Sequence, residues 1–544
     1  MDRADSTIEK GTHSVQPSLQ NTSILRPDRP EERYLKGFRL FQVYSGFLIT
    51  VLLITLDQTI VATALPQIVS HFNALNDVTW PVTAYFLTQG GLILFVGQVL
   101  KLFPKKTVYL SSTALFEIGS LICALANSMP LFIVGRAIAG CGAAGIQMSV
   151  ATLTPEITPL EKRPVLYATF GGVLGLSAVL GPLLGGTFTD KVSWRWCFWI
   201  NLPCGAVGAA VVFFLLKIHP QDETQSKHKW MHLDWAGAVL MLGSFASFLL
   251  PLQWGGNVKA WNNPTVIALF AVSAALLLIF LVWERRLSFK AMVPLRLLAR
   301  RTQVGGAVAG FLGYLAMLLV TYYLPLWYQA RGQTAIQSGL SILPYLISLV
   351  VAAGVAGAIV TKFGNYWWFL FLCPITTAVA GGLLFTLRAE TPTAHLIGFQ
   401  ILYGIGIGAT FQNVLLAVQV DFADDEDMIP QATAFVSFTQ ILGGIVGIAV
   451  AGSIFANRFR HYLDIFASDL PPDARAAVLQ TVTVIKLLPL ELKNQVVEAY
   501  ARGLGPIFLL SVVAAILSSL STLLIANVNI HTRAKAISES RATS

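Results

Sequence analysis

Three charged side chains, Asp57, Glu117 and Arg136, lie deep inside long apolar stretches of the sequence. Placing such a charge at the centre of a bilayer costs roughly 2.5–3.5 kcal/mol, so a charge that persists there usually serves a function. A buried carboxylate can bind and release a proton, and a nearby arginine can act as its counter-charge. We therefore interpret these three residues as candidate proton-coupling groups. The alternative is a structural ion pair or a hydrogen bond between helices.

Small residues and one proline form a second candidate segment, residues 175–186. Small side chains let two membrane helices approach closely, and a proline removes a backbone hydrogen bond and bends its helix. We expect a tight helix contact, a hinge, or both. The candidate residues are Gly175, Gly181, Pro182, Gly185 and Gly186.

The apolar stretches that carry these residues dominate the chain. Of its 544 residues, 55% are hydrophobic and 12% are charged, whereas a soluble domain carries about 25% charged residues. Apolar runs of about twenty residues recur from residue 41 almost to the C-terminus, and each is long enough to span a bilayer. The sequence therefore predicts an all-α integral membrane protein with about fourteen transmembrane helices.

The apolar runs also predict where each span lies and how the chain is oriented. An even number of spans places both termini on one side. Most lysines and arginines fall on that side, so the positive-inside rule predicts cytosolic termini. The predicted spans are 41–66, 80–100, 107–127, 131–153, 165–187, 196–218, 233–252, 264–283, 304–327, 338–361, 366–387, 393–419, 431–455 and 504–526.

Three segments do not fit a membrane span. Residues 1–40 are polar and lack the apolar core of a signal peptide, which predicts a disordered cytosolic tail. Residues 456–503 predict an outer loop with a short amphipathic helix from Ala476 to Leu490. The segment from Glu284 to Gln303 alternates arginines with leucines, a composition typical of an interfacial helix beside anionic headgroups.

A weak internal repeat relates the first and last parts of the chain. Repeated halves with a site near the midplane are typical of secondary transporters. Gly97 and Phe103 share their spacing with Gly357 and Phe363, and Arg136, Gly140 and Gly142 share theirs with Gln400, Gly404 and Gly406. The predicted organisation is a tail (1–40), a six-helix half (41–218), two extra transmembrane helices with a cytosolic linker (219–303), a second six-helix half (304–527) and a cytosolic tail (528–544).

The composition argues against several other classes of protein. The net charge is +9, but the basic residues lie in short clusters between apolar runs, so we expect no nucleic-acid binding. The five cysteines show no metal-type spacing. The sequence has no phosphate-binding loop of an ATP-driven pump and no cofactor motif or nucleophile of an enzyme. We therefore expect no metal, no cofactor and no enzymatic activity.

Five motifs, in order, resemble those of the fourteen-span drug:proton antiporters of the major facilitator superfamily, especially the fungal toxin and multidrug efflux pumps. The motifs are Leu56–Pro66; Trp80 with Tyr85 and Leu87; Gly135, Arg136 and Ala137 with Gly140, Gly142 and Gly145; Gly175–Gly186; and Trp194–Pro203. One motif departs from the wider superfamily. The loop that follows Gly97 lacks the acidic residue usual there, which puts in doubt a conformational latch built on a charge pair at that loop.

The resemblance implies the major facilitator fold and alternating access by two halves around a central cavity. It further implies proton-coupled efflux of a hydrophobic or amphipathic small molecule, such as a drug, mycotoxin or other secondary metabolite. The candidate cavity residues are polar or aromatic and lie at mid-helix depth: Gln89, Gln147, Tyr314, Tyr322, Gln400, Gln412, Asn413, Phe438 and Gln440.

The expected partners are a small-molecule substrate, protons and the lipid bilayer, and the expected state is a monomer. The expected location is the plasma membrane, with a vacuolar or vesicular membrane as the alternative. Two other functions fit the same features: proton-coupled uptake of a nutrient or siderophore, and a transporter-like receptor or channel. The sequence does not identify the substrate.

Overall fold

The computed structural model describes residues 34–74, 79–217, 229–256, 259–287, 290–480 and 482–543. Most of the predicted N-terminal tail lies outside these residues, and the first helix already begins at Gly37. Among the described residues, fourteen helices are long and apolar enough to cross a membrane, which confirms the predicted number. Helices suit this environment because their backbone groups bond to one another, and lipid offers no alternative partner.

The elements are helices, and several consecutive ones are separated by only a few residues. The spanning helices are α1 (Gly37–His71), α2 (Trp80–Leu102), α3 (Lys105–Leu125), α4 (Met129–Ile157), α5 (Arg163–Lys191), α7 (Asn201–Leu215) with the short α6 (Trp196–Trp199) before it, α8 (Trp235–Trp254), α9 (Pro264–Leu287), α11 (Arg301–Ala330), α13 (Leu343–Phe363) with α12 (Ala335–Ser341) before it, α14 (Trp367–Phe385), α15 (Thr393–Asp421), α16 (Ile429–Phe466) and α18 (Leu490–Ser521). The remaining elements are α10 (Leu295–Ala299), α17 (Pro472–Gln480), α19 (Ile530–Thr543) and the 3-10 turns η3 (Leu160–Lys162), η4 (Lys229–His232), η6 (Glu426–Met428), η7 (Val482–Leu487) and η8 (Thr522–Leu524).

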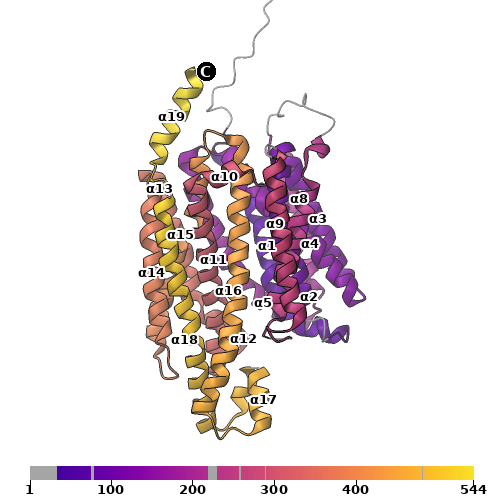
Figure 1. Ribbon diagram of the computed structural model, residues 1–544, viewed down its shortest axis with the longest axis vertical. Coiled ribbons are helices and arrows are strands. Elements are labelled where there is room, and N and C mark those ends of the chain that lie inside the picture. Colours follow the sequence, from indigo (N-terminus) through magenta and orange to yellow (C-terminus); the bar gives the residue numbers. More distant parts are fainter. Residues whose placement is uncertain are drawn as a thin grey trace, which may run out of the picture.

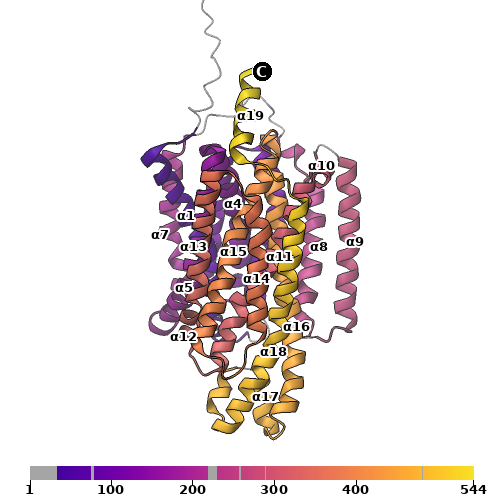
Figure 2. The ribbon, with the colours of Figure 1, turned by 90° about the vertical axis from the view of Figure 1, so that its left-hand side faces the viewer.

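The spanning helices run roughly parallel to the long axis of the molecule (Figures 1 and 2). Helices α1 to α5 and α7 pack against one another, and so do α11, α13, α14, α15, α16 and α18. We call these groups the N-terminal bundle and the C-terminal bundle. Helices α8 and α9 pack together, and α8 docks on α2. Helix α9 lies at the edge of the molecule in Figure 2.

The most extensive contacts between the bundles are made by two helix pairs, α2 with α16 and α5 with α13. The glycines of the sequence repeat lie at these two contacts. A Cβ on Gly97 of α2 would lie 2.5 Å from the Cβ of Ala434, and a Cβ on Gly357 of α13 would lie 3.0 Å from that of Ala168. The repeated glycines therefore mark equivalent close crossings between the bundles, as small residues do in membrane helices.

Residues 456–503 are more helical than the sequence predicted. Helix α16 continues to Phe466 and α18 begins at Leu490, so only α17 and η7 lie in the connection. The two long helices stay together because Phe455 and Phe459 pack on Tyr500, with ring centroids 4.8 and 5.0 Å apart. This hairpin projects beyond the other helices, at the end opposite α19 (Figure 1).

Candidate functional site

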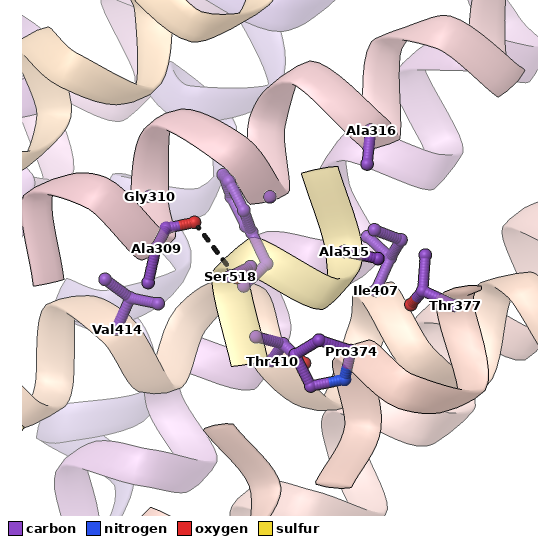
Figure 3. Close-up of a pocket in the computed structure, with 12 residues that line it drawn as sticks. Ala309, Gly310, Ala316, Pro374, Thr377, Ile407, Thr410, Val414, Ala515 and Ser518 are labelled. Atoms are coloured by element: carbon purple, nitrogen blue, oxygen red, sulfur yellow. Dashed lines mark hydrogen bonds between the residues drawn. The ribbon is translucent and has the colours of Figure 1, made fainter. Parts of the chain in front are cut away.

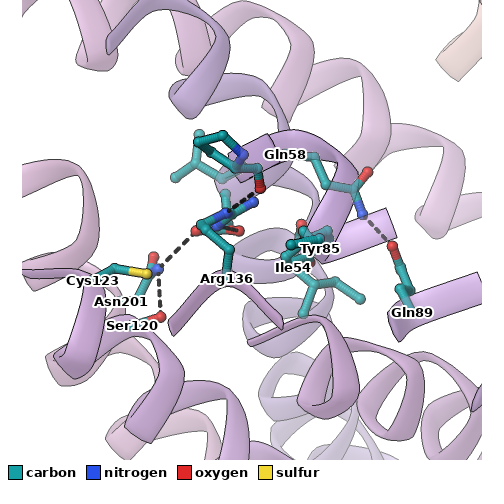
Figure 4. A network of polar contacts seen from close by, with 12 residues as sticks. Ile54, Gln58, Tyr85, Gln89, Ser120, Cys123, Arg136 and Asn201 are labelled. Carbon is teal, nitrogen blue, oxygen red and sulfur yellow. Dashed lines mark hydrogen bonds and ion pairs between the residues drawn. The ribbon is translucent and has the colours of Figure 1, made fainter. Parts of the chain in front are cut away.

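Asp57 of α1 and Arg136 of α4 form an ion pair inside the N-terminal bundle (Figure 4). Arg136 Nη1 donates to Asp57 Oδ2 at 2.5 Å, and its Nε donates to the carbonyl oxygen of Pro81 at 3.2 Å. Both residues are buried, with exposed fractions of 0% and 2%. The structure thus brings together two of the three charged residues that the sequence singled out.

Aromatic rings complete the enclosure of the arginine. Its guanidinium carbon lies 4.3 Å from the ring centroid of Tyr85 and 6.0 Å from that of Phe198. Arg136 is the eighth residue of α4, which places its Cα about 10 Å along that helix from the end opposite α19. The pair is therefore shielded from water but lies near one end of the bundle.

Two neutral residues that the sequence analysis did not select connect to this pair. Asn201 Nδ2 lies 3.5 Å from Asp57 Oδ1 and 3.1 Å from Ser120 Oγ, and it donates to both. Asn201 lies in the motif Trp194–Pro203, which was its only signal in the sequence. Its place in the network depends on how α7 packs against α1 and α3, which spacing alone does not determine.

Glu117 of α3, the third charged candidate, lies apart from the ion pair. Both carboxyl oxygens are buried and have no hydrogen-bond partner among the described residues. The carboxyl group faces Gly205 of α7, where a side chain of any size would collide with it. Ser120 lies one turn further along α3, on the same face of the helix. Glu117 is thus an unpaired carboxyl group one turn from the Asn201 network.

The small residues of α5 form two different contacts. A Cβ on Gly181 would lie 2.5 Å from the Cβ of Thr59, and one on Gly185 would lie 2.8 Å from the carbonyl oxygen of Ile60, both in α1. Gly175 instead faces Val350 of α13 at 3.0 Å. Gly186 is different, since no described heavy atom lies within 4 Å of a Cβ built there.

Helix α5 therefore contacts α1 on one side and the C-terminal bundle on the other. Hydroxyl groups reinforce the first contact: Ser177 Oγ lies 2.6 Å from Thr55 Oγ1, and Thr59 Oγ1 donates to the carbonyl oxygen of Ser177 at 3.0 Å. Pro182 lies inside the helix between these contacts. Direct contacts of α5 therefore connect α1 to α13.

Three glutamine side chains form a row across the N-terminal bundle. Figure 4 shows the first two, Gln58 and Gln89. Gln58 Nε2 donates to Gln89 Oε1 at 3.2 Å, and Gln89 Nε2 donates to Gln147 Oε1 at 3.1 Å. Two of the three, Gln89 and Gln147, were predicted cavity residues. Gln58 adjoins Asp57 in sequence, so the row begins beside the ion pair.

The predicted cavity residues of the C-terminal bundle differ in their surroundings. Tyr314 stacks on Phe411 with ring centroids 5.6 Å apart, and Tyr322 is 47% exposed. Gln400 is buried and donates to Tyr328 Oη at 2.7 Å. Of these three residues, Tyr322 is the exposed one.

The other four predicted cavity residues are buried. Asn413 Nδ2 donates to the carbonyl oxygen of Ala409 at 2.7 Å, and Phe438 packs on Phe245 of α8 with ring centroids 5.8 Å apart. Gln412 Oε1 and Gln440 Nε2 have no hydrogen-bond partner among the described residues. Those two amides therefore keep hydrogen-bonding capacity that a polar group of a substrate could use.

Two pockets lie next to each other at α15. One lies between the bundles and is lined by residues of α5, α11, α13 and α15, including Gln412 and Phe411. The other lies among α11, α14, α15 and α18 (Figure 3). The hydroxyls of Thr377, Thr410 and Ser518 in its wall are bonded to backbone carbonyls, so this second pocket is apolar. Phe411 borders both pockets.

The bundles meet through polar contacts at the end that carries α19. Tyr167 Oη of α5 donates to Gln419 Oε1 of α15 at 2.7 Å, and Gln419 Nε2 donates to the carbonyl oxygen of Ala151 at 3.3 Å. Asp424, shortly after Gln419, pairs with Arg533 of α19, which identifies this end. The passage between the bundles is therefore closed here.

The linker between α9 and α10 lies in the same closed end. Gln98 of α2 donates to the carbonyl oxygen of Lys290 at 2.8 Å, and Gln431 of α16 donates to those of Ala291 and Met292 at 3.0 and 3.2 Å. Glu284 fixes the linker by accepting from the backbone N–H groups of Met292 and Val293. The expected interfacial helix is thus only the short α10, and the linker before it is bound to both bundles.

No group of three or more histidine, cysteine, aspartate or glutamate side chains in the described part of the chain could hold a metal ion. The arrangement instead offers an ion pair, unpaired amides and apolar walls. These features suit the binding and movement of a proton and of a mainly apolar molecule.

Known proteins resemble this chain in sequence and in fold. Residues 47–448 match the family described as Major Facilitator Superfamily. The MFS-type transporter astH of Aspergillus oryzae is 39% identical over 94% of this chain and 90% of its own length. The rubrofusarin-specific efflux pump aurT of Gibberella zeae is 36% identical over 91% and 90%.

A second efflux protein and a solved structure agree with these matches. The aspyridones efflux protein of Neocamarosporium betae is 37% identical over 89% of this chain and 86% of its own length. The crystallised proton:xylose symporter XylE has the same fold, with a TM-score of 0.57 at 13% identity over 91% of this chain and 98% of its own. With fourteen candidate spans in the described residues and relatives named as efflux pumps, this chain belongs to the major facilitator superfamily of membrane transporters.

Proposed function

We propose that this protein exports a hydrophobic or amphipathic small molecule, such as a secondary metabolite, toxin or drug, in exchange for protons. Two observations support the proposal. Relatives that match about nine tenths of the chain are named as efflux pumps for such compounds. The buried pair of Asp57 and Arg136 supplies a carboxyl group that can be charged or neutral inside the membrane. The proposed proton coupling rests on this pair.

The geometry supports a sequence of events for this exchange. A proton from the outer side neutralises the Asp57 carboxylate and weakens its attraction to Arg136. Helix α1 is then less firmly held to α4, and its contacts with Ser177 and Gly181 of α5 carry the change to the seam with α13. Opening of the inner end exposes the substrate pocket to the cytosol and lets the proton leave. The substrate takes the opposite path, as alternating access requires.

The pockets support a substrate that is mainly apolar with a few polar groups. The unpaired amides of Gln412 and Gln440 offer an acceptor and a donor, while Phe411, Tyr314 and the wall of the second pocket offer apolar and aromatic surface. The protein acts as a monomer in this proposal, because one chain supplies the ion pair and both pockets. The proposed location is the plasma membrane, where export clears the cell of its substrate.

A reconstitution experiment tests this function. Purified protein is placed in liposomes with its cytosolic face outward, and rubrofusarin and an aspyridone serve as probes. An acidic lumen should drive the probe inward, and an ionophore that collapses the pH gradient should abolish the accumulation. Movement of the probe out of an acidic lumen would indicate symport, and equilibration that ignores the gradient would indicate a channel; either result contradicts the proposal.

A further inference from the structure

We propose that Glu117 is a second proton-binding site, which exchanges protons with Asp57 along a path that Asn201 and Ser120 hold in place by their hydrogen bonds. The inference rests on the proposed proton coupling and adds a route for the proton. The route lies in the seam between α1, α3 and α7, away from the two pockets, which are lined by α5 and helices of the C-terminal bundle. Proton and substrate would then cross the membrane by different paths.

The first argument is the hydrogen-bonding state of Glu117. An ionised carboxylate in an apolar seam without a donor is very costly, whereas the neutral acid is tolerated. Both oxygens of Glu117 are buried and unpartnered among the described residues, and Gly205 opposite offers no side chain. Glu117 thus differs from Asp57, whose charge is matched by Arg136. The structure therefore contains one carboxyl group in a setting for the charged form and one in a setting for the neutral form.

The second argument is complementarity between Glu117 and Asn201. Asn201 Oδ1 is a buried acceptor without a described donor, and the neutral acid of Glu117 carries a donor without an acceptor. Asn201 and Gly205 are four residues apart on α7, so they share one face of that helix. Because Glu117 touches Gly205, its carboxyl group lies about one helical turn, roughly 6 Å along the helix axis, from Asn201. A rotamer change or one water molecule can close that distance.

The third argument is the polar side chains that continue the row beyond Glu117. Thr113 and Tyr109 follow at intervals of four residues on α3, and Tyr109 Oη lies 3.0 Å from Thr50 Oγ1 of α1. Thr113 Oγ1 donates to the carbonyl oxygen of Tyr109 at 2.9 Å. Hydroxyl groups therefore lead from the seam toward the end that carries α19. The row as a whole runs from the outer part of the bundle toward the inner end.

Several titratable groups lie on the elements around Glu117 and bear on its proton exchange. They are Asp57 of α1, Arg136 of α4, Cys123 and Tyr109 of α3, Cys197 of α6 and Cys204 of α7. Of these, Asp57 is the nearest carboxylate along the row of hydrogen bonds. A proton that leaves Asp57 restores its ion pair with Arg136. Glu117 receives that proton as a carboxylate, after its own proton has left toward the α19 end, and it thereby becomes the neutral acid again.

A chemical probe tests the protonation state without any transport substrate. Dicyclohexylcarbodiimide adds to protonated carboxyl groups in apolar surroundings, and the product is located by mass spectrometry of the full-length protein in lipid nanodiscs. Glu117 should be modified at neutral pH and Asp57 should not. Asn201→Ala should shift the pH at which the modification of Glu117 falls by half, which loss of packing alone would not do. Absence of modification at Glu117 would overturn the proposal.

Transport by variants separates this proposal from the proposed function. Glu117→Gln keeps the size of a side chain that has no partner to lose, so it should fold and exchange probe down a probe gradient. In this variant, the accumulation of the probe that a pH gradient drives should fall about tenfold or more. Glu117→Asp should recover part of that accumulation. If Asp57→Asn loses gradient-driven accumulation while Glu117→Gln keeps it, the relay is wrong and the coupling stands. If both variants keep it, the proton coupling itself is wrong.

Discussion

The two bundles use equivalent positions for different chemistry. In the N-terminal bundle, Arg136 lies one turn before Gly140, forms an ion pair and stacks on Tyr85. In the C-terminal bundle, Gln400 lies one turn before Gly404 and donates to the neutral Tyr328 Oη. Gly140 and Gly404 both touch a tyrosine backbone, those of Tyr85 and Tyr345. The two bundles therefore share the close packing at Gly140 and Gly404, but the residue one turn earlier is charged in the first bundle and neutral in the second.

This difference suggests a division of tasks between the bundles. Each charge that is buried in the membrane adds a desolvation cost. Confining the charged pair to one bundle limits that cost. The other bundle then remains free to form apolar surface. The pocket of Figure 3 lies entirely among C-terminal helices and is lined by small and apolar residues. We expect substitutions in the first bundle to change the coupling and those in the second to change the substrate.

The largest expected effect comes from Asp57→Asn. The amide can still accept a hydrogen bond from Arg136, so the protein should reach the membrane, but it cannot bind the transported proton. Accumulation driven by a pH gradient should fall by about a hundredfold or more in proteoliposomes. Gln400→Leu is the matched control in the other bundle and should keep its dependence on the gradient. Equal losses of gradient-driven accumulation in Asp57→Asn and Gln400→Leu would show that the two bundles do not differ in this way.

Thermal stability should also differ between variants at the equivalent positions Arg136 and Gln400. Loss of one partner from a buried ion pair costs about 3–5 kcal/mol, so Arg136→Gln should lower the thermal stability strongly in nanodiscs. Gln400→Leu removes one neutral hydrogen bond, worth about 1 kcal/mol. The double variant Asp57→Asn with Arg136→Gln should regain stability but not coupling. Similar unfolding temperatures for Arg136→Gln and Gln400→Leu would contradict this difference between the two bundles.

The contact of α5 with α1 gives a third test. Gly181 lies in this contact, and Gly186 of the same helix serves as the control. Gly181→Leu places a side chain against Thr59, where no space exists, and the overpacking should cost about 1–3 kcal/mol and reduce transport. Gly186→Leu, five residues away, meets open space in the described structure and should transport normally. Surface expression measured alongside separates impaired transport from misfolding. Normal transport by Gly181→Leu would show that this contact is not critical.

The smallest expected effect concerns the hairpin of the C-terminal bundle. Ser468 is exposed in the connection between α16 and α17, so Ser468→Cys should leave transport unchanged. A membrane-impermeant maleimide added to intact cells should label this cysteine if the end opposite α19 faces outward. A cysteine near the C-terminus, at Ser538, should react only after permeabilisation. The reverse pattern would invert the predicted topology.

Much of the fold could be predicted from the sequence, because lipid imposes long apolar helices and the apolar runs are plain. The connection 456–503 was predicted less well. Phe455, Phe459 and Leu463 place an apolar face on one side of α16, while Arg458, Arg460 and His461 lower the mean hydropathy of the same stretch. A window that averages over all faces therefore ends the helix too early.

The candidate site was predictable only in part. Asp57 and Arg136 could be found because isolated charges in apolar runs are rare, yet their pairing depends on how α1 packs on α4. Asn201 and Ser120 gave little signal, since neutral polar residues are common in membrane helices. The surroundings of Phe438, which contacts α8, could not be predicted because docking of the inserted helices leaves no regular pattern in the sequence.

The linker between α9 and α10 has a consequence for the balance between the two faces of the transporter. Its carbonyl groups accept three hydrogen bonds, one from α2 and two from α16. Opening this end separates the linker from one bundle and so breaks either the one bond to α2 or the two bonds to α16. At about 1 kcal/mol for each bond, these bonds favour the closed state by about fivefold to thirtyfold, since each 1.4 kcal/mol is a factor of ten. The two inserted helices then stabilise the closed inner end. We therefore expect the resting transporter to favour the state in which a proton reaches Asp57 from the outer side.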